Sequence, residues 1–141
     1  MSDNAKAQAY LQLAKDSTKQ NEDLAYAYSY HRADRYGYPV DDYANKISAL
    51  TKAIQSNPNP RFGIHYFSRA MTYDCIRIVY GKKYVDYNKM LEDYNRAIEI
   101  EPDSIYYYKG RKDVYKRLGE KEKAKADAQK IKELKNNKKS K

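Results

Sequence analysis

Apolar residues recur along most of this chain at the three- and four-residue spacing of an amphipathic helix. No segment shows the sustained two-residue alternation that is typical of a β-strand. Glycine and proline, which interrupt helices, separate the apolar segments from one another. The pattern therefore predicts seven helices, at about 3–20, 22–36, 41–56, 61–80, 84–100, 103–118 and 120–136.

Residues near the ends of these segments support the expected boundaries. Gly119 directly follows Leu118, as expected of a glycine that ends a helix. Near the expected helix starts lie side chains that suit free N–H groups, namely Asp41, Asp103 or Ser104, and Glu120. We expect helix breaks or turns at Gly37, Pro39, Pro58, Pro60, Gly63, Gly81, Pro102, Gly110 and Gly119.

Two motifs recur along the chain. LTKAIQSNP, which ends at Pro58, and YNRAIEIEP, which ends at Pro102, both place isoleucine directly after an alanine and proline five residues after it. Upstream, a tyrosine follows an arginine by four residues in three places: Arg32 and Tyr36, Arg69 and Tyr73, and Arg111 and Tyr115. The residue after each arginine is Ala33, Ala70 or Lys112.

These motifs resemble the tetratricopeptide repeat, a pair of helices with small residues at fixed positions. DYNRAIEIEP, at residues 93–102, is similar to the end of the family's second helix, and VYKRLGEKEKAKAD, at residues 114–127, is similar to its central turn. The resemblance implies an all-α fold, a right-handed stack of antiparallel helix pairs that forms an α-solenoid. It implies one domain over residues 1–136, with units at about 24–58, 61–102 and 104–136.

Both chain ends and the second unit depart from the repeat. Residues 3–20 match no repeat helix and fit an amphipathic N-terminal capping helix. Residues 137–141 are expected to form a basic disordered tail. The second unit carries an insertion of about eight residues near Cys75 to Tyr87, which we interpret as two extra helical turns and a wider loop around Gly81.

In the tetratricopeptide family, one stripe of each first helix lines a concave groove that holds an extended or helical ligand. Carried over position by position, the resemblance assigns to this stripe Tyr30, Asp34, Phe67, Met71, Asp74, Tyr106, Lys109, Asp113 and Lys116. Aromatic anchors among charges of both signs are typical of a specific binding surface. The alternative is that Phe67 and Met71 fill core space, since aromatic stripes on helices usually do. Full burial of Phe67 and Tyr106 would exclude the groove.

Three consecutive tyrosines begin the third unit, and successive residues on a helix point in different directions. We expect Tyr108 in the core and Tyr106 in the groove. Tyr107 is expected at the flank or against the previous unit.

The net positive charge of the chain lies in its last quarter. Residues 104–141 hold fourteen basic and five acidic side chains, which accounts for the formal net charge of +9. The segment KIKELKNNKKSK, at residues 130–141, is the most basic part. A solvated, fraying helix end is one interpretation. The alternative function that it raises is a nucleic-acid-associated helical protein that uses this Lys-rich quarter.

Residues that carry chemistry are scarce. One cysteine, Cys75, and two histidines on different expected helices, His31 and His65, provide no metal-site spacing, and no catalytic or phosphate-binding motif appears. We expect no catalytic residue, metal or cofactor. The predicted function is a protein–protein interaction scaffold, not an enzyme, that binds a protein or peptide segment in a concave groove. With no membrane-spanning apolar run and no N-terminal signal pattern, we expect a cytoplasmic location.

Overall fold

Every regular element that the structure describes is an α-helix. The computed structural model describes residues 42–81 and 85–139. The helices are α3 (Asp42–Ser56), α4 (Ile64–Tyr80), α5 (Tyr87–Ile100), α6 (Ile105–Arg117) and α7 (Lys121–Lys139). The expected all-α class is therefore confirmed for this part of the chain. The helices expected at 3–20 and 22–36, including the capping helix, lie outside the described residues.

Two of the expected glycine boundaries are confirmed. Gly81 follows the end of α4 with φ 111°, and Gly119 follows α6 with φ 77°. Both φ values lie in the positive region, which glycine adopts without steric strain. After α6, the Glu120 N–H donates to the Tyr115 carbonyl at 2.9 Å and the Gly119 N–H donates to the Lys116 carbonyl at 3.1 Å. These two bonds satisfy the last carbonyls of the helix in a Schellman motif.

Two other predictions about helix limits are wrong. Gly110 lies inside α6 and not at a helix break. The position is a glycine because the ring of Tyr94 occupies the space that a side chain would fill. α7 continues to Lys139, so residues 137–139 are helical and not part of the expected tail. Buried Leu134 anchors the final turns of α7, and the lysines of its last turn suit the negative end of the helix dipole.

α5 begins three residues later than the pattern indicated, because Asp86 caps it. The Asp86 Oδ1 atom accepts hydrogen bonds from the Asn88 N–H at 2.9 Å and from the Lys89 N–H at 3.4 Å. A carboxylate at this position satisfies N–H groups that have no partner within the helix.

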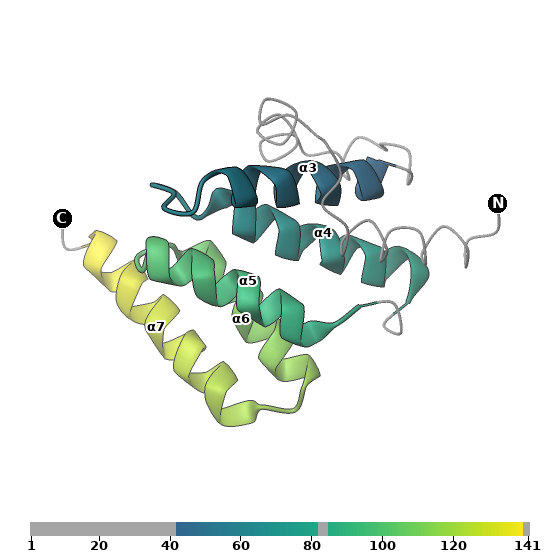
Figure 1. The fold of residues 1–141 in the computed structure, drawn as a ribbon. Coiled ribbons are helices and arrows are strands. Elements are labelled where there is room, and N and C mark those ends of the chain that lie inside the picture. Colours follow the sequence, from purple (N-terminus) through teal and green to yellow (C-terminus); the bar gives the residue numbers. More distant parts are fainter. Residues whose placement is uncertain (1–41, 82–84, 140–141) are drawn as a thin grey trace.

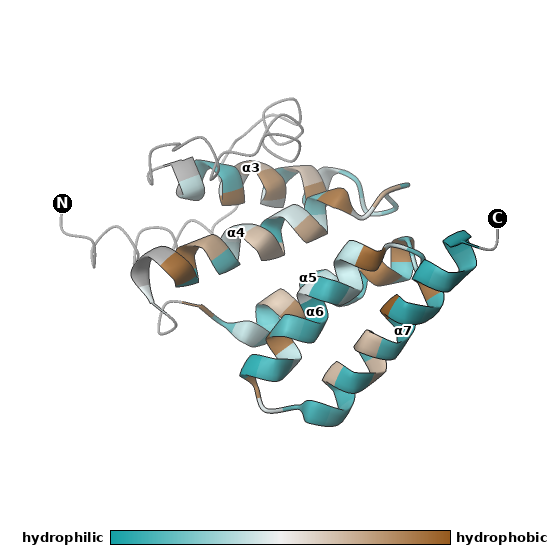
Figure 2. Ribbon diagram, turned by 180° about the vertical axis from the view of Figure 1, so that it is seen from behind, coloured by the Kyte–Doolittle hydropathy of each residue, from teal (hydrophilic) through white to brown (hydrophobic). Residues whose placement is uncertain are grey.

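Each described helix packs against the helix that follows it along the chain, and successive helices run in opposite directions (Figure 1). The largest core cluster joins α3, α4, α5 and α6. Its buried members are Tyr43, Ile47, Ala70, Tyr73, Ile76, Met90, Tyr94 and Val114. A second cluster places Ile131 and Leu134 of α7 against Tyr108 of α6. α7 is otherwise largely hydrophilic (Figure 2).

The predicted insertion appears as a longer helix followed by a longer connection. α4 continues eleven residues past Arg69, whereas α6 continues six residues past the corresponding Arg111. The additional five residues make about one and a half helical turns, somewhat less than the two turns expected. The connection from α4 to α5 spans residues 81–86, whereas the connection from α6 to α7 spans only residues 118–120.

An arginine–aspartate ion pair of the same geometry joins the two helices of each of two helical hairpins, α4–α5 and α6–α7. In α4–α5, Arg69 donates from Nε to Asp93 Oδ2 at 2.9 Å and from Nη2 to Asp93 Oδ1 at 2.7 Å. In α6–α7, Arg111 makes the matching bonds to Asp127 at 2.9 and 2.6 Å. The partners are 24 residues apart in the first hairpin and 16 in the second, so the insertion is eight residues long.

Each arginine also reaches the helix before its own hairpin. The Nη1 atom of Arg69 donates to Thr51 Oγ1 of α3 at 3.2 Å. The Nη1 atom of Arg111 donates to Asn95 Oδ1 of α5 at 3.0 Å. One planar guanidinium therefore joins three consecutive helices. Its five N–H donors in a rigid plane suit this geometry, whereas the single ammonium group of a lysine does not.

Both carboxylates of these pairs are nearly inaccessible to water, with side chains 5% and 4% exposed for Asp93 and Asp127. Burial raises the pKa of Asp93, and the hydrogen bonds from Arg69 oppose that rise. The hydrogen bonds to Asp127 raise the pKa of Arg111, whose guanidinium lies within 6 Å of the ring centroids of two tyrosines of α6. Removal of one partner would leave the other charge buried and unpaired, which destabilises a fold strongly.

We expect Arg111→Ala to lower the free energy of unfolding by about 2–3 kcal/mol in urea denaturation, because Asp127 loses both charge-assisted hydrogen bonds. The Arg111 side chain is 20% exposed, which keeps this value below that of a fully buried pair. Lys112→Ala is the matched control: it removes one positive charge from the next position and should change stability by about 0.5 kcal/mol or less. Equal effects of the two substitutions would contradict a special role for Arg111.

Candidate functional site

The repeated arginines occupy one side of α4 and α6, and the candidate residues occupy the other. Successive helical residues are rotated by about 100°, so Met71 points about 160° away from Arg69. Asp113 bears the same relation to Arg111. Because the arginine sides are packed against neighbouring helices, the opposite sides remain available. We name the surface formed by Phe67, Met71 and Asp74 of α4 with Tyr106, Lys109, Asp113 and Lys116 of α6 the α4–α6 face.

Most side chains of the α4–α6 face are accessible. Tyr106 is 68% exposed and Met71 is 41% exposed, so two large apolar side chains of this face are accessible to solvent. Lys109, Asp113 and Lys116 are also exposed. The Nζ atom of Lys109 lies 5.8 Å from the centroid of the Tyr106 ring, at cation–π distance. The remaining two candidates, Tyr30 and Asp34, lie outside the described residues.

Phe67 packs against the core and is also partly exposed on the α4–α6 face. It is half-buried, and its ring lies 5.0 Å from that of Tyr107 and 6.1 Å from that of Tyr94, measured between centroids. Since neither Phe67 nor Tyr106 is fully buried, the condition that would exclude the groove is not met. Phe67 nonetheless contributes to core packing, as the alternative interpretation stated.

The three consecutive tyrosines point where the helical period predicts. Tyr108 is 6% exposed and packs in the cluster with α7, whereas Tyr106 is 68% exposed. Tyr107 is also 6% exposed and contacts Phe67 of the preceding hairpin.

Tyr94 of α5 forms the floor of the α4–α6 face. Tyr94 is 2% exposed, and its hydroxyl donates to the Met71 sulfur at 3.5 Å. A Cβ atom on Gly110 would lie 2.5 Å from Tyr94 Cζ and 2.7 Å from Oη, so only glycine fits there without displacement. The ring of Tyr94 thus lies between α4 and α6, and the absence of a side chain at Gly110 lets α6 approach it.

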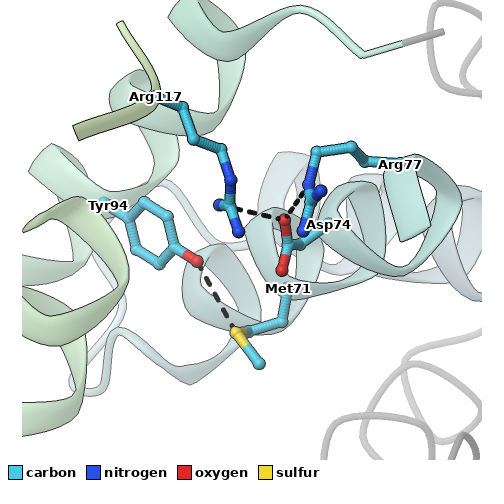
Figure 3. A network of polar contacts seen from close by, with 5 residues as sticks. All are labelled: Met71, Asp74, Arg77, Tyr94 and Arg117. Carbon is cyan, nitrogen blue, oxygen red and sulfur yellow. Dashed lines mark hydrogen bonds and ion pairs between the residues drawn. The ribbon is translucent and has the colours of Figure 1, made fainter. Parts of the chain in front are cut away.

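An ion-pair network crosses the face beside Tyr94 (Figure 3). Asp74 Oδ1 accepts from Arg77 Nε at 2.8 Å within α4 and from Arg117 Nη1 of α6 at 3.4 Å. The side chains of these residues are 22–32% exposed. Asp74 therefore connects the two helices, in addition to the partner contact expected of it.

The hydroxyl of Tyr94 lies in a region of opposing charges. Burial raises the pKa of Tyr94 well above its usual value, and the negative charges of Asp74 and Asp113 raise it further. Arg117 acts in the opposite direction. The hydroxyl therefore stays protonated to a higher pH than an ordinary tyrosine does, and it acts as a hydrogen-bond donor.

Sequence reasoning missed Tyr94, Gly110 and Arg117 as parts of this face. Tyr94 belongs to a second helix, whereas the stripe was drawn only on first helices. Gly110 was interpreted as a break, although a glycine inside a strongly helical segment is itself a signal of close packing. Arg117 lies one helical turn beyond Asp113, so the period of the stripe could have located it.

Comparisons with protein-family models, with curated proteins and with solved structures find no match for this chain. Within residues 42–81 and 85–139, no three His, Cys, Asp or Glu side chains are grouped as metal ligands would be. No helix in the same part of the chain combines the length and the apolar character needed to span a bilayer. The function must therefore be argued from the geometry of the α4–α6 face.

We expect Gly110→Ala to destabilise the protein by about 1–3 kcal/mol, because the new methyl group overlaps the buried ring of Tyr94. Helix propensity alone would give the opposite sign, a gain of about 1 kcal/mol. Asp113→Ala, at an exposed position of the same helix, is the control and should change stability by about 0.5 kcal/mol or less. Urea denaturation distinguishes these results, and a stabilised Gly110→Ala variant would refute the close contact.

Alkaline pH should destabilise the fold through Tyr94. Above about pH 10 the tyrosine ionises in the unfolded chain but stays protonated in the fold, so the free energy of unfolding should fall by about 1.4 kcal/mol per pH unit between pH 10 and 12 on its account. Tyr94→Phe should remove this share of the slope. Tyr106→Phe, which removes an exposed hydroxyl, should keep the wild-type slope. Identical slopes for all three proteins would show that Tyr94 is not buried as described.

Proposed function

We propose that this chain is a protein–protein interaction scaffold that holds an extended or helical segment of a partner against the α4–α6 face. The observation that carries the proposal is the exposure of Met71 on α4 and Tyr106 on α6, two helices that both pack against the buried residue Tyr94. Large apolar side chains that are accessible among charged neighbours are characteristic of binding surfaces.

The proposed architecture is a right-handed stack of helical hairpins similar to tetratricopeptide repeats. In this proposal α3 is the second helix of the first unit, α4–α5 is the second unit and α6–α7 is the third. Two features support it: each described helix packs on the next along the chain, and both complete hairpins use the same arginine–aspartate pair. The stripe inferred from the tetratricopeptide resemblance then corresponds to the α4–α6 face.

The proposed division of roles follows from the side chains themselves. Tyr106 is the principal anchor, because a tyrosine ring can bury a large area while its hydroxyl remains hydrogen-bonded. Met71 is adaptable, because its unbranched thioether can fit different apolar partners. Lys109, Asp113 and Lys116 alternate in sign along α6 and would set the register of the bound segment by charge complementarity. The proposal assigns no catalytic step to the face.

The test uses peptides selected for binding to the wild-type protein from a random display library, followed by isothermal titration calorimetry. We expect Met71→Ala/Tyr106→Ala to weaken binding of the selected peptides by about tenfold or more, because truncation of anchor residues costs about 1 kcal/mol or more each. Circular dichroism should show helix content close to wild type, since both side chains are exposed, and urea denaturation measures the stability lost because the Tyr94 hydroxyl no longer has the Met71 sulfur as its acceptor.

Phe62→Ala is the matched control. Phe62 is 54% exposed and lies in the connection before α4, outside the α4–α6 face. It should leave affinity within about twofold of wild type. Selected peptides that bind the double variant as tightly as the wild type would contradict the proposed function.

A further inference from the structure

Lysines of α7 lie along one side of the helix. α7 carries eight lysines and three acidic residues. At about 100° per residue, five of these lysines point within about 80° of one another. They form the lysine stripe: Lys121, Lys125, Lys132, Lys135 and Lys139.

The lysine stripe is exposed and almost unpaired. All five side chains are exposed, and α7 has no acidic residue within the stripe. Asp127 faces α6, where it forms an ion pair with Arg111. Among the described residues, the stripe makes one ion pair, from Lys125 to Glu122 at 3.5 Å. Both partners of this pair are more than three-quarters exposed, so it neutralises little of the local charge.

Core packing fixes the direction of the stripe. Ala124, Ile131 and Leu134 of α7 are buried, and Ile131 and Leu134 pack against Tyr108. These contacts hold the rotation of α7 about its axis. The five ammonium groups are therefore carried by one helix, which continues to Lys139.

We propose that the lysine stripe binds the phosphate backbone of double-stranded nucleic acid, without recognition of base sequence. The stripe extends over about 27 Å of helix, which equals the length of about eight base pairs. Lysine acts toward phosphate as a point charge, so five such groups supply affinity but little geometric specificity. This activity uses a surface of α7 that is separate from the α4–α6 face, and it goes beyond the scaffold function.

The composition of the stripe disfavours two other anionic partners. The exposed side of α7 has no aromatic ring on which unpaired bases could stack, so it does not suit a single strand. Its large apolar residues, Ile131 and Leu134, are buried, so the helix offers no apolar face for insertion into a membrane.

The experiment measures fluorescence anisotropy of a labelled duplex of about 16 base pairs, twice the length of the stripe, between about 50 and 200 mM salt. For five phosphate contacts, the logarithm of the binding constant should fall against the logarithm of salt concentration with a slope of about −4.5. Lys125→Gln/Lys132→Gln should reduce the steepness of the slope by about 2 and weaken binding by about tenfold or more at the lower salt concentration.

The matched control is Lys123→Gln/Lys130→Gln. It removes the same charge from the same helix with the same seven-residue spacing, but from the opposite flank, where Lys123 lies beside the Tyr115 ring. The control should bind within about threefold of wild type. Circular dichroism establishes that both variants keep their helices.

Equal losses of affinity in the two variants would overturn the proposal, because they would indicate an effect of net charge alone. Tighter binding of an oligothymidine single strand than of the duplex would also overturn it. So would binding to phosphatidylserine-containing vesicles but not to the duplex, or no duplex binding at the lower salt concentration.

Discussion

A guanidinium held by a carboxylate between two helices is the interaction on which the described fold depends most. It occurs at Arg69 and again at Arg111, with the same atoms, nearly the same distances, and a third bond to the preceding helix. Each carboxylate is almost inaccessible to water. Substitution of its arginine would therefore leave a negative charge that water cannot solvate. The pair also sets the relative rotation of the helices, because a bidentate contact tolerates little change in angle. The remaining surfaces of α4 and α6 are positioned by this constraint.

The sides of α4 and α6 that carry the two arginines determine which sides of these helices remain accessible to a partner. They hold one side of α4 and α6 against neighbouring helices, and the opposite side carries Met71 and Tyr106. Beneath that side, Tyr94 fills the space that Gly110 leaves open, and Asp74 connects to Arg117 across the helices. The α4–α6 face therefore rests on packed and ion-paired residues, although its outer side chains are accessible. A rigid support under exposed anchors reduces the entropy lost when a partner binds.

The periodicity of apolar residues was sufficient to predict the five helices from α3 to α7, since burial of one face per turn leaves a direct trace in the sequence. It also predicted the separate directions of Tyr106, Tyr107 and Tyr108, because these depend only on helix geometry. The arginine motif was visible, but its aspartate partners were not. The insertion shifts Asp93 by eight residues relative to Asp127, and a contact between helices has no fixed sequence spacing. Gly110 was misjudged because its reason lies on another helix, in the ring of Tyr94.

The most direct test of the repeated arginine–aspartate pair is a double-mutant cycle at each hairpin, with urea denaturation of the single and double alanine variants of Arg69 with Asp93 and of Arg111 with Asp127. These contacts predict a coupling energy of about 1.5 kcal/mol or more in each cycle, because both partners share two charge-assisted hydrogen bonds. Effects that add within about 0.5 kcal/mol at both hairpins would contradict the account.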